Sequence, residues 1–322
     1  MTRGAWALAP LALVALTAGC GPARPAAAPP TGGPWQASVD AGHPLVGRIW
    51  EPATASFTSS EDLITRAGAA SYVVLGEKHD HADHHRLQAR VLKGVLRARR
   101  TPVLALEMID VDEQERLDHA PAEPGAFAAA VGWDERGFAP FSSYRPVLEV
   151  ALGAELRIVG ANLPRAQARA VAKGGLSALD APTRARLGLD APQAPGEAQA
   201  MAEEIRVAHC DVLPPSALPS MAAAQRARDA TLAATLAAVP PAQGAVLITG
   251  AGHARRDRGV PAHLARRAPG AVVVSIAFVE VEHDKDDPAA YGALPYDAVW
   301  FTPRLDDLDP CRAFRKRGAP SP

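Results

Sequence analysis

Histidines and carboxylates gather in one short stretch of the chain. The segment "LGEKHDHADHHRLQ" occupies residues 75–88 and holds four histidines, three acidic residues and a lysine. Imidazoles and carboxylates are the side chains that ligate divalent metals and transfer protons near neutral pH. The segment therefore indicates a metal site, a catalytic loop, or only the solvated start of a helix.

Strands and helices alternate around this segment. Near-continuous aliphatic runs, which suit strands buried on both faces, predict strands at 71–76, 102–107, 155–162, 244–250 and 270–278, with a last strand at 296–303. Periodic stretches predict helices at 81–100, 112–130, 145–153, 164–171, 197–210, 216–239 and 260–268. We therefore expect an α/β fold, with a mostly parallel central sheet, helices on both faces and a loop or helical insertion at 174–200.

Polar side chains follow four of the predicted strands. Glu77 and His79 come after the first strand, and the second strand ends at Glu107. The third strand ends at Asn162, and His253 follows the fourth. Because ligands bind beyond the carboxyl ends of strands in an open parallel sheet, we expect these five side chains to meet at one edge.

Each of these residues also has a purely structural explanation. Glu77 and His79 could form a solvated turn, and a lone histidine such as His253 is more often structural than a ligand. Glu107, however, ends an aliphatic run, and a buried carboxylate is costly without a partner. A histidine or a metal would supply that partner.

Helices add further candidates. Gln225 and Asp229 fall on the apolar stripe of the helix at 216–239, where they either satisfy a structural network or line the same cleft. With Asp80 as helix cap, His85 and Gln88 share a face that can reach the cleft. An i, i+4 pair of His81 and His85 could chelate a metal, but we expect His81 and His84 to face water.

The N-terminus is typical of an exported lipoprotein. Residues 1–19 combine Arg3, a short apolar run and small residues, and "LTAGC" resembles a lipobox that would place a lipid on Cys20. We expect residues 20–45 to be a flexible Pro/Ala/Gly tether, residues 46–310 a domain and residues 311–322 a C-terminal tail. These features predict a lipid-anchored protein of the bacterial cell envelope.

The net charge argues against one class of partner, and the cysteine content predicts a disulfide. With 34 basic and 35 acidic residues, the net charge of −1 argues against nucleic acid as a partner. Apart from Cys20, the chain has Cys210 and Cys311, an even pair in an oxidising compartment. We predict a disulfide between them; the alternative is two separate buried thiols.

Five motifs occur in an order that resembles a known family. The segments "VVLGEKHDHADHHRLQ", "PVLALEM", "VGANLP", "AQRARDATLA" and "VLITGAGHARRDRGVPAHL" are similar to the ChaN-like haem-binding uptake family, in the superfamily of the Tiki and TraB proteins and the erythromycin esterases. The resemblance covers roughly residues 46–282. It matches Gly76, Glu77, His79, Asp80, His85, Gln88, Glu107, Gly250, Gly252 and His253 to the family pattern.

The resemblance implies a lipoprotein that binds haem or iron during uptake. Since a tyrosine ligates haem in the family, it suggests Tyr144, which we expect to be exposed, with Arg145 pairing a haem propionate. Further cofactor contacts would come from His85, Gln88, Gln225 and Asp229. The implied partners are haem, the membrane through the lipid anchor, an unknown component of the uptake system and a possible second copy of the chain.

Enzymes of the same superfamily imply an alternative, a metal-dependent envelope hydrolase. Glu77, His79 and His253 would then bind a divalent metal or activate water, and Glu107 would orient a histidine or carry a proton. The chain has no serine or cysteine nucleophile motif, so water activation is the hydrolytic route that remains. A binding module without haem or catalysis is the third possibility.

Overall fold

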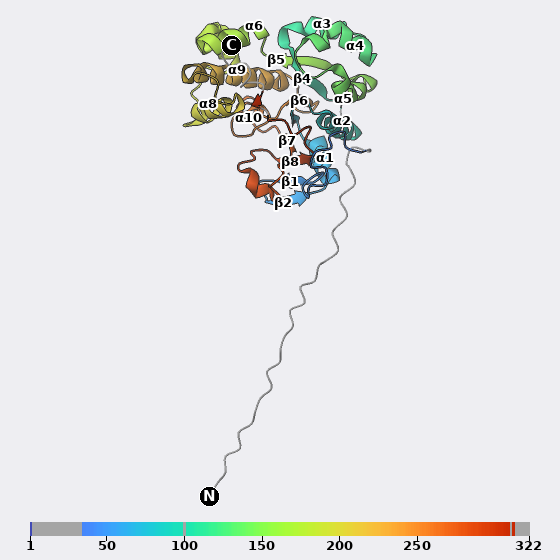
Figure 1. Ribbon diagram of the computed structural model, residues 1–322. Helices are drawn as coiled ribbons and strands as arrows, with labels where there is room; N and C mark the ends of the chain where they lie inside the picture. Colours follow the sequence, from blue (N-terminus) through green and yellow to red (C-terminus); the bar gives the residue numbers. More distant parts are fainter. Residues whose placement is uncertain (2–33, 99–100, 310, 313–322) are drawn as a thin grey trace, which may run out of the picture.

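The computed structural model describes residues 1, 34–98, 101–309 and 311–312 of the chain (Figure 1). Residues 2–19 of the predicted signal peptide lie outside these residues, as do 20–33 of the predicted tether, which include Cys20, and 313–322 of the predicted tail. Across the described ranges, no helix has both the length and the apolar character that crossing a bilayer requires.

One eight-stranded sheet forms the centre of the molecule. Its order is β2-β1-β8-β7-β3-β6-β4-β5, in which β8 to β5 run parallel and β1 and β2 add an antiparallel edge. The strands are β1 (Ile49–Glu51), β2 (Ser56–Thr58), β3 (Tyr72–Glu77), β4 (Val103–Asp110), β5 (Ile158–Asn162), β6 (Ala245–Gly250), β7 (Val273–Glu280) and β8 (Ala298–Thr302). Residues of β3 to β6 are almost all buried, as strands covered on both faces must be.

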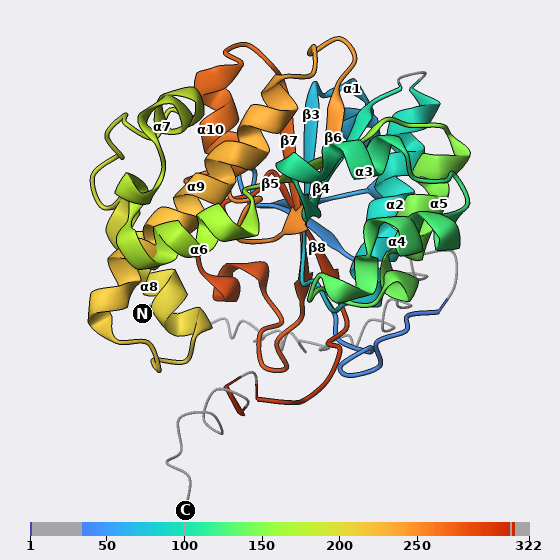
Figure 2. The same ribbon diagram turned by 90° about the horizontal axis from the view of Figure 1, so that it is seen from above.

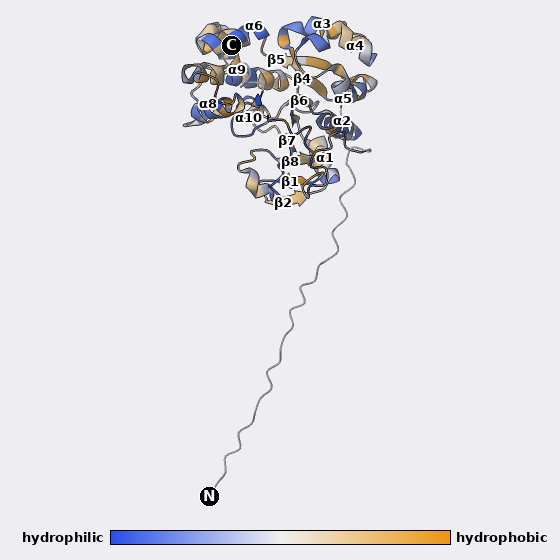
Figure 3. Cartoon of the chain, in the orientation of Figure 1, coloured by the Kyte–Doolittle hydropathy of each residue, from blue (hydrophilic) through white to orange (hydrophobic). Residues whose placement is uncertain are grey.

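Helices cover both faces of the sheet (Figure 2). They are α1 (Ser60–Ala69), α2 (Ala82–Arg97), α3 (Gln114–Asp118), α4 (Pro124–Val131), α5 (Phe141–Gly153), α6 (Arg165–Gly174), α7 (Ala181–Leu187), α8 (Glu197–Ala208), α9 (Leu218–Ala237) and α10 (Val260–Arg267). One core lies between the sheet and α1 to α5, and a second between the sheet, α9 and α10. The helices α6, α7 and α8 pack on the outer side of α9, and the helices carry both hydrophilic and hydrophobic residues (Figure 3).

The predicted fold class is confirmed, and the six predicted strands correspond to β3–β8. The short strands β1 and β2 and helix α1 are additions. The helix predicted at 112–130 is divided, because Pro124 begins a new helix, α4, whose first backbone N–H groups are capped by Glu123. The stretch at 174–200 contains a short helix, α7.

The tether prediction for residues 34–45 is wrong. Ala37 and Leu45 are buried, and the carboxylate of Asp83 accepts hydrogen bonds from the backbone N–H groups of Gln36 and Ala37. This segment is therefore the first part of the domain. Every described strand, helix and core cluster lies at residue 34 or beyond, so we expect residues 34–322 to fold without the preceding segment.

The predicted disulfide is present: Cys210, just after α8, is bonded to Cys311. It joins two points 101 residues apart in sequence. A bond that closes so long a loop removes much of the freedom of the unfolded chain.

We predict that Cys210→Ser/Cys311→Ser lowers the free energy of unfolding by about 2–4 kcal/mol. Urea unfolding of residues 34–322 measures this loss, with the wild type under strong reductant as a second comparison. A denaturing thiol titration that finds two free thiols in the untreated wild type would contradict the assignment.

Candidate functional site

The strand order brings the predicted polar residues to one edge of the sheet. Strand β6 lies between β3 and β4, with Glu77 paired in register to Gly250 and Leu106 to Ile248. Glu77 and Glu107 thus flank the end of β6, and His253 lies in the turn that follows it. All three are almost fully buried. The expected convergence at the carboxyl ends of the strands is therefore found.

Four side chains, from α2, α5 and the turn after β3, surround the carboxylate of Glu77. Its Oε1 accepts a hydrogen bond from the Tyr144 hydroxyl and lies 2.8 Å from Nδ1 of His79. Its Oε2 accepts from Nε2 of Gln88 at 2.6 Å and lies 3.3 Å from Nε2 of His85. Burial alone raises the pKa of the Glu77 carboxyl, but the charge of His85 and the hydrogen bond with His79 outweigh burial and lower the pKa to about 2.

Glu107 has an equally complete set of partners. Its Oε2 accepts from the hydroxyl of Thr249 at 2.6 Å and from the backbone N–H of Gly250 at 2.7 Å, and its Oε1 accepts from the guanidinium of Arg228. Burial would raise the pKa of the Glu107 carboxyl, but the charges of His253 and Arg228 hold it well below its usual range. The costly buried carboxylate anticipated from the sequence is thus fully satisfied.

Arg228 is the functional residue that sequence reasoning missed. It lies on α9, and its Nε donates to Oδ1 of Asn162 at 3.1 Å. This bond joins Asn162, the fifth predicted residue, to Glu107. The sequence offered one indication of this role: the buried Glu107 needs a cationic partner, and Arg228 directly precedes Asp229 on the helix predicted to face the site.

His253 connects Glu107 to α9. Its Nδ1 lies 2.6 Å from Oδ1 of Asp229, its Nε2 lies 3.5 Å from Glu107, and Gln225 lies 3.2 Å from the ring. Burial lowers the pKa of His253, but the charges of Glu107 and Asp229 outweigh burial and raise the pKa to about 9. Burial also raises the pKa of Asp229. Gln225 and Asp229 therefore belong to this network.

His79 is a partly exposed member of this otherwise buried cluster. Its side chain is 36% exposed, and its ring packs edge-on against Phe138 with centroids 5.0 Å apart. Burial lowers the pKa of His79, but its hydrogen bond with Glu77 and the charge of Glu107 raise the pKa above its usual value. A Cβ atom on Gly250 would lie 3.0 Å from Nε2 of His79, so glycine leaves room for the ring.

The expectation that Tyr144 is exposed is wrong. Tyr144 is fully buried and stacks on the ring of His85 with centroids 3.8 Å apart, because α5 packs directly over α2. Arg145, its neighbour on α5, is exposed and pairs with Glu149 at 3.4 Å. A role for Tyr144 as a haem ligand stays a prediction that requires its bond to Glu77 to break.

His81 and His84 are also buried, not solvated. The end of β8 covers the start of α2, so Nε2 of His81 bonds to the carbonyl of Pro303 at 2.9 Å and Nε2 of His84 to the hydroxyl of Thr302 at 3.0 Å. Burial lowers the pKa of both histidines, which stack on each other. The N-cap position of α2 is His81, not Asp80.

The metal prediction gains no support from this arrangement. His81 points to β8 while His85 points to Glu77, so the two do not form a chelating pair. Within the described parts of the chain, no group of three or more His, Cys, Asp or Glu side chains is arranged to hold a metal ion.

The charges of the cluster also limit its chemistry. With a pKa of about 9, His253 carries a proton at neutral pH and is not a general base there. Both glutamates are ionised and occupied by donors. His79 is the ring of the cluster that reaches solvent. A hydrolase that activates water in this cleft is therefore not favoured.

We predict that Tyr144→Phe lowers the free energy of unfolding by about 1.5–3 kcal/mol, because a buried carboxylate loses a donor. Tyr72→Phe is the matched control, since Tyr72 is equally buried but donates to a neutral carbonyl, that of Val239, at 2.8 Å. Urea unfolding of both variants measures the difference. An equal or smaller loss for Tyr144→Phe would show that the Glu77 bond contributes little.

The pKa of His253 predicts a loss of stability in alkali. Because the folded pKa of about 9 exceeds the usual 6.5, the folded state binds this proton more tightly than the unfolded chain does. The stabilisation is complete below pH 6.5 and disappears as the pH rises through 9, a loss of about 3 kcal/mol. Urea unfolding at intervals from pH 6 to about 10 measures it. His253→Gln should remove this pH dependence, and an unchanged slope in that variant would disprove the assignment.

Comparison with solved structures agrees with the α/β fold. The solved structure described as "Cofacial heme binding to ChaN of Campylobacter jejuni" matches with a TM-score of 0.62 and 22% identity, over 78% of this chain and 95% of that one. The type III effector HopBA1 (TM-score 0.41, 14% identity, 75% and 91% coverage) and an erythromycin esterase mutant (0.41, 16%, 68% and 72%) are more distant. No curated protein matches the chain.

A family model covers the whole buried cluster. The model described as "Haem-binding uptake, Tiki superfamily, ChaN" matches residues 63–264, a range that contains Glu77, Glu107, Arg228 and His253. The chain belongs to this ChaN family of haem-binding uptake proteins.

Proposed function

We propose that this protein is an exported lipoprotein that binds haem and acts in the uptake of haem or iron. The observation that carries the proposal is the family match, which spans most of the domain and includes every residue of the buried cluster. The signal-like residues 1–19 and the lipobox ending at Cys20 support export and lipidation. The lipid would hold the domain at the periplasmic side of the outer membrane, beside a component of the uptake system.

Apart from the exposed Arg145, the residues anticipated as haem contacts belong to the filled buried network. Tyr144 and His85 are fully buried against each other, and Gln88 donates to Glu77. These side chains do not fit an iron-ligating role in the arrangement described, because no face of Tyr144 or His85 is open to a flat ligand. The proposal of haem binding therefore rests on the family and not on an assigned axial ligand.

A second copy of the chain is part of the proposal. The protein from Campylobacter jejuni binds haem cofacially. We propose that haem is held between two copies of this chain, an arrangement that needs no internal cavity large enough for the ring. Light scattering with and without hemin reports whether a homodimer forms with the ligand.

Titration of tag-free residues 34–322 with hemin tests the proposal. We expect a saturable change in the Soret band at micromolar protein, with a fixed stoichiometry. His85→Ala and Tyr144→Phe should keep this change, because both rings are buried. Loss in Tyr144→Phe alone would identify the tyrosine as a ligand and require the cleft to open. A wild type without a saturable change would contradict haem binding.

A further inference from the structure

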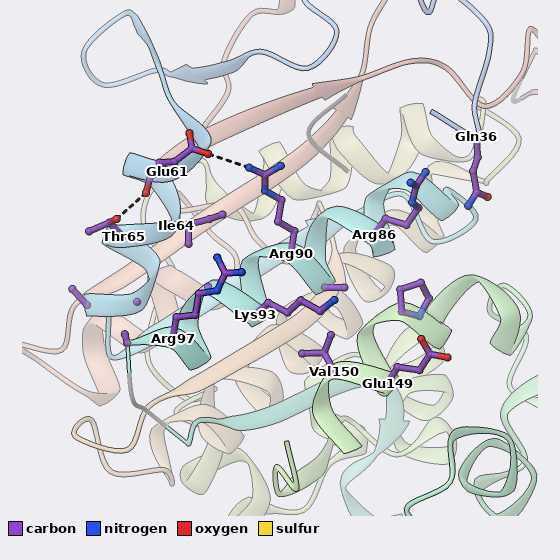
Figure 4. Close-up of a pocket in the computed structure, with 16 residues that line it drawn as sticks. Gln36, Glu61, Ile64, Thr65, Arg86, Arg90, Lys93, Arg97, Glu149 and Val150 are labelled. Carbon is purple, nitrogen blue, oxygen red and sulfur yellow. Dashed lines mark hydrogen bonds and ion pairs between the residues drawn. The ribbon is translucent and has the colours of Figure 1, made fainter. Parts of the chain in front are cut away.

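A large groove, lined by none of the residues of the buried cluster, lies between α1, α2 and α5 (Figure 4). Its volume is about 1270 Å³, and its walls combine apolar and charged side chains. This mixture suits a ligand with an apolar body and a charged head, such as an amphipathic lipid. Nothing in the haem proposal uses this groove.

The floor of the groove is apolar. Ile64 of α1, Ala89 of α2 and Val150 of α5 all contribute to its lining. The helices α1 and α2 approach closely, because Gly94 has no side chain and a Cβ atom there would overlap Ile64. The apolar lining therefore consists of aliphatic side chains and glycine backbone, against which an acyl chain can pack.

One side of the groove is cationic. Arg86, Arg90, Lys93 and Arg97 recur at intervals of four, three and four residues, so they lie along one face of α2 (Figure 4). Two acidic side chains, Glu61 and Glu149, also line the groove.

Part of this positive charge is not neutralised by the protein. Arg86 pairs with Asp83 at 3.0 Å and Arg90 with Glu61 at 3.2 Å. Lys93 and Arg97 are exposed, and neither has an ion-pair partner among the residues that the structure describes. These two cations are available to an anion in the groove.

The N-terminal segment joins the domain at the same place. Nη1 of Arg86 donates to the carbonyl of Pro34 at 2.8 Å, and Gln36 lines one end of the groove. Residues 20–33, which would connect a lipidated Cys20 to Pro34, span at most about 50 Å when fully extended. A membrane that holds the lipid is therefore within reach of the groove.

We propose that the groove binds an anionic phospholipid of that membrane. The phosphate head would lie at Lys93 and Arg97, and an acyl chain would lie along the apolar floor. A tetrapyrrole also has an apolar body and carboxylates, but the lining residues include no imidazole, phenol, thiol or thioether to ligate its iron. The position of Pro34 beside the groove also favours the lipid. Only this argument from position rests on the proposed lipidation, and none rests on haem binding.

Vesicle flotation of residues 34–322 tests the inference without the lipid anchor. We expect binding to vesicles that contain phosphatidylglycerol, little binding to pure phosphatidylcholine, and loss of binding in about 1 M salt, where charges are screened within about 3 Å. Lys93→Gln/Arg97→Gln should weaken binding by about tenfold or more. The matched control is Arg169→Gln/Lys173→Gln on α6, which removes two exposed cations at the same spacing from a helix that packs against α9.

Several results would overturn the inference. They are no binding of the wild type, equal binding to both kinds of vesicle, or an equal loss in the two double variants. A hemin titration of Lys93→Gln/Arg97→Gln distinguishes a phospholipid from a tetrapyrrole as the occupant. If this variant loses hemin binding but keeps vesicle binding, the groove holds a tetrapyrrole. Melting temperatures of the variants within a few degrees of the wild type confirm that they are folded.

Discussion

Two carboxylates, Glu77 and Glu107, are buried on either side of the end of β6, and both need donors from the protein because they have almost no exposure to solvent. A buried charge without partners costs several kcal/mol, so each donor is under a strict geometric requirement. Glu107 receives a guanidinium, a hydroxyl and a backbone N–H, and Glu77 a phenol and an amide, with imidazoles beside both. The two carboxylates thereby determine which side chains the surrounding helices must present.

This requirement connects the two helical layers. Helices α2 and α5 supply Gln88, His85 and Tyr144 from one face of the sheet, and α9 supplies Arg228 and Asp229 from the other. Helices that share few apolar contacts with each other are thus held by the same charged centre. A substitution here is expected to act on stability as well as on any ligand, and binding experiments need a stability control for that reason.

The sequence was most informative where a physical rule acts locally. Aliphatic runs predicted strands β3–β8, and the edge rule for parallel sheets correctly brought Glu77, Glu107, Asn162 and His253 together, since strand ends and strand direction decide those positions. Exposure was less predictable. His81 and His84 look solvated on their own helix, and only the end of β8, more than 200 residues later, covers them.

Tyr144 and Arg228 illustrate the same limit within the site. Both act through long-range contacts, Tyr144 with a residue 67 positions away and Arg228 with one 121 positions away, and neither contact follows from helical spacing. The need for glycine at positions 94 and 250 likewise follows only from long-range neighbours, because a Cβ atom there would meet Ile64 and His79.

The central claim is that Glu107 is ionised and that its negative charge stabilises the protonated ring of His253 inside the protein. The most direct measurement is an NMR titration of the His253 ring in the wild type and in Glu107→Gln. The account predicts a pKa of about 9 in the wild type and a clearly lower one in the variant, with His283, which is exposed and bonded to Asp40, unchanged between the two. A His253 that titrates at the same pH in both proteins would contradict the account.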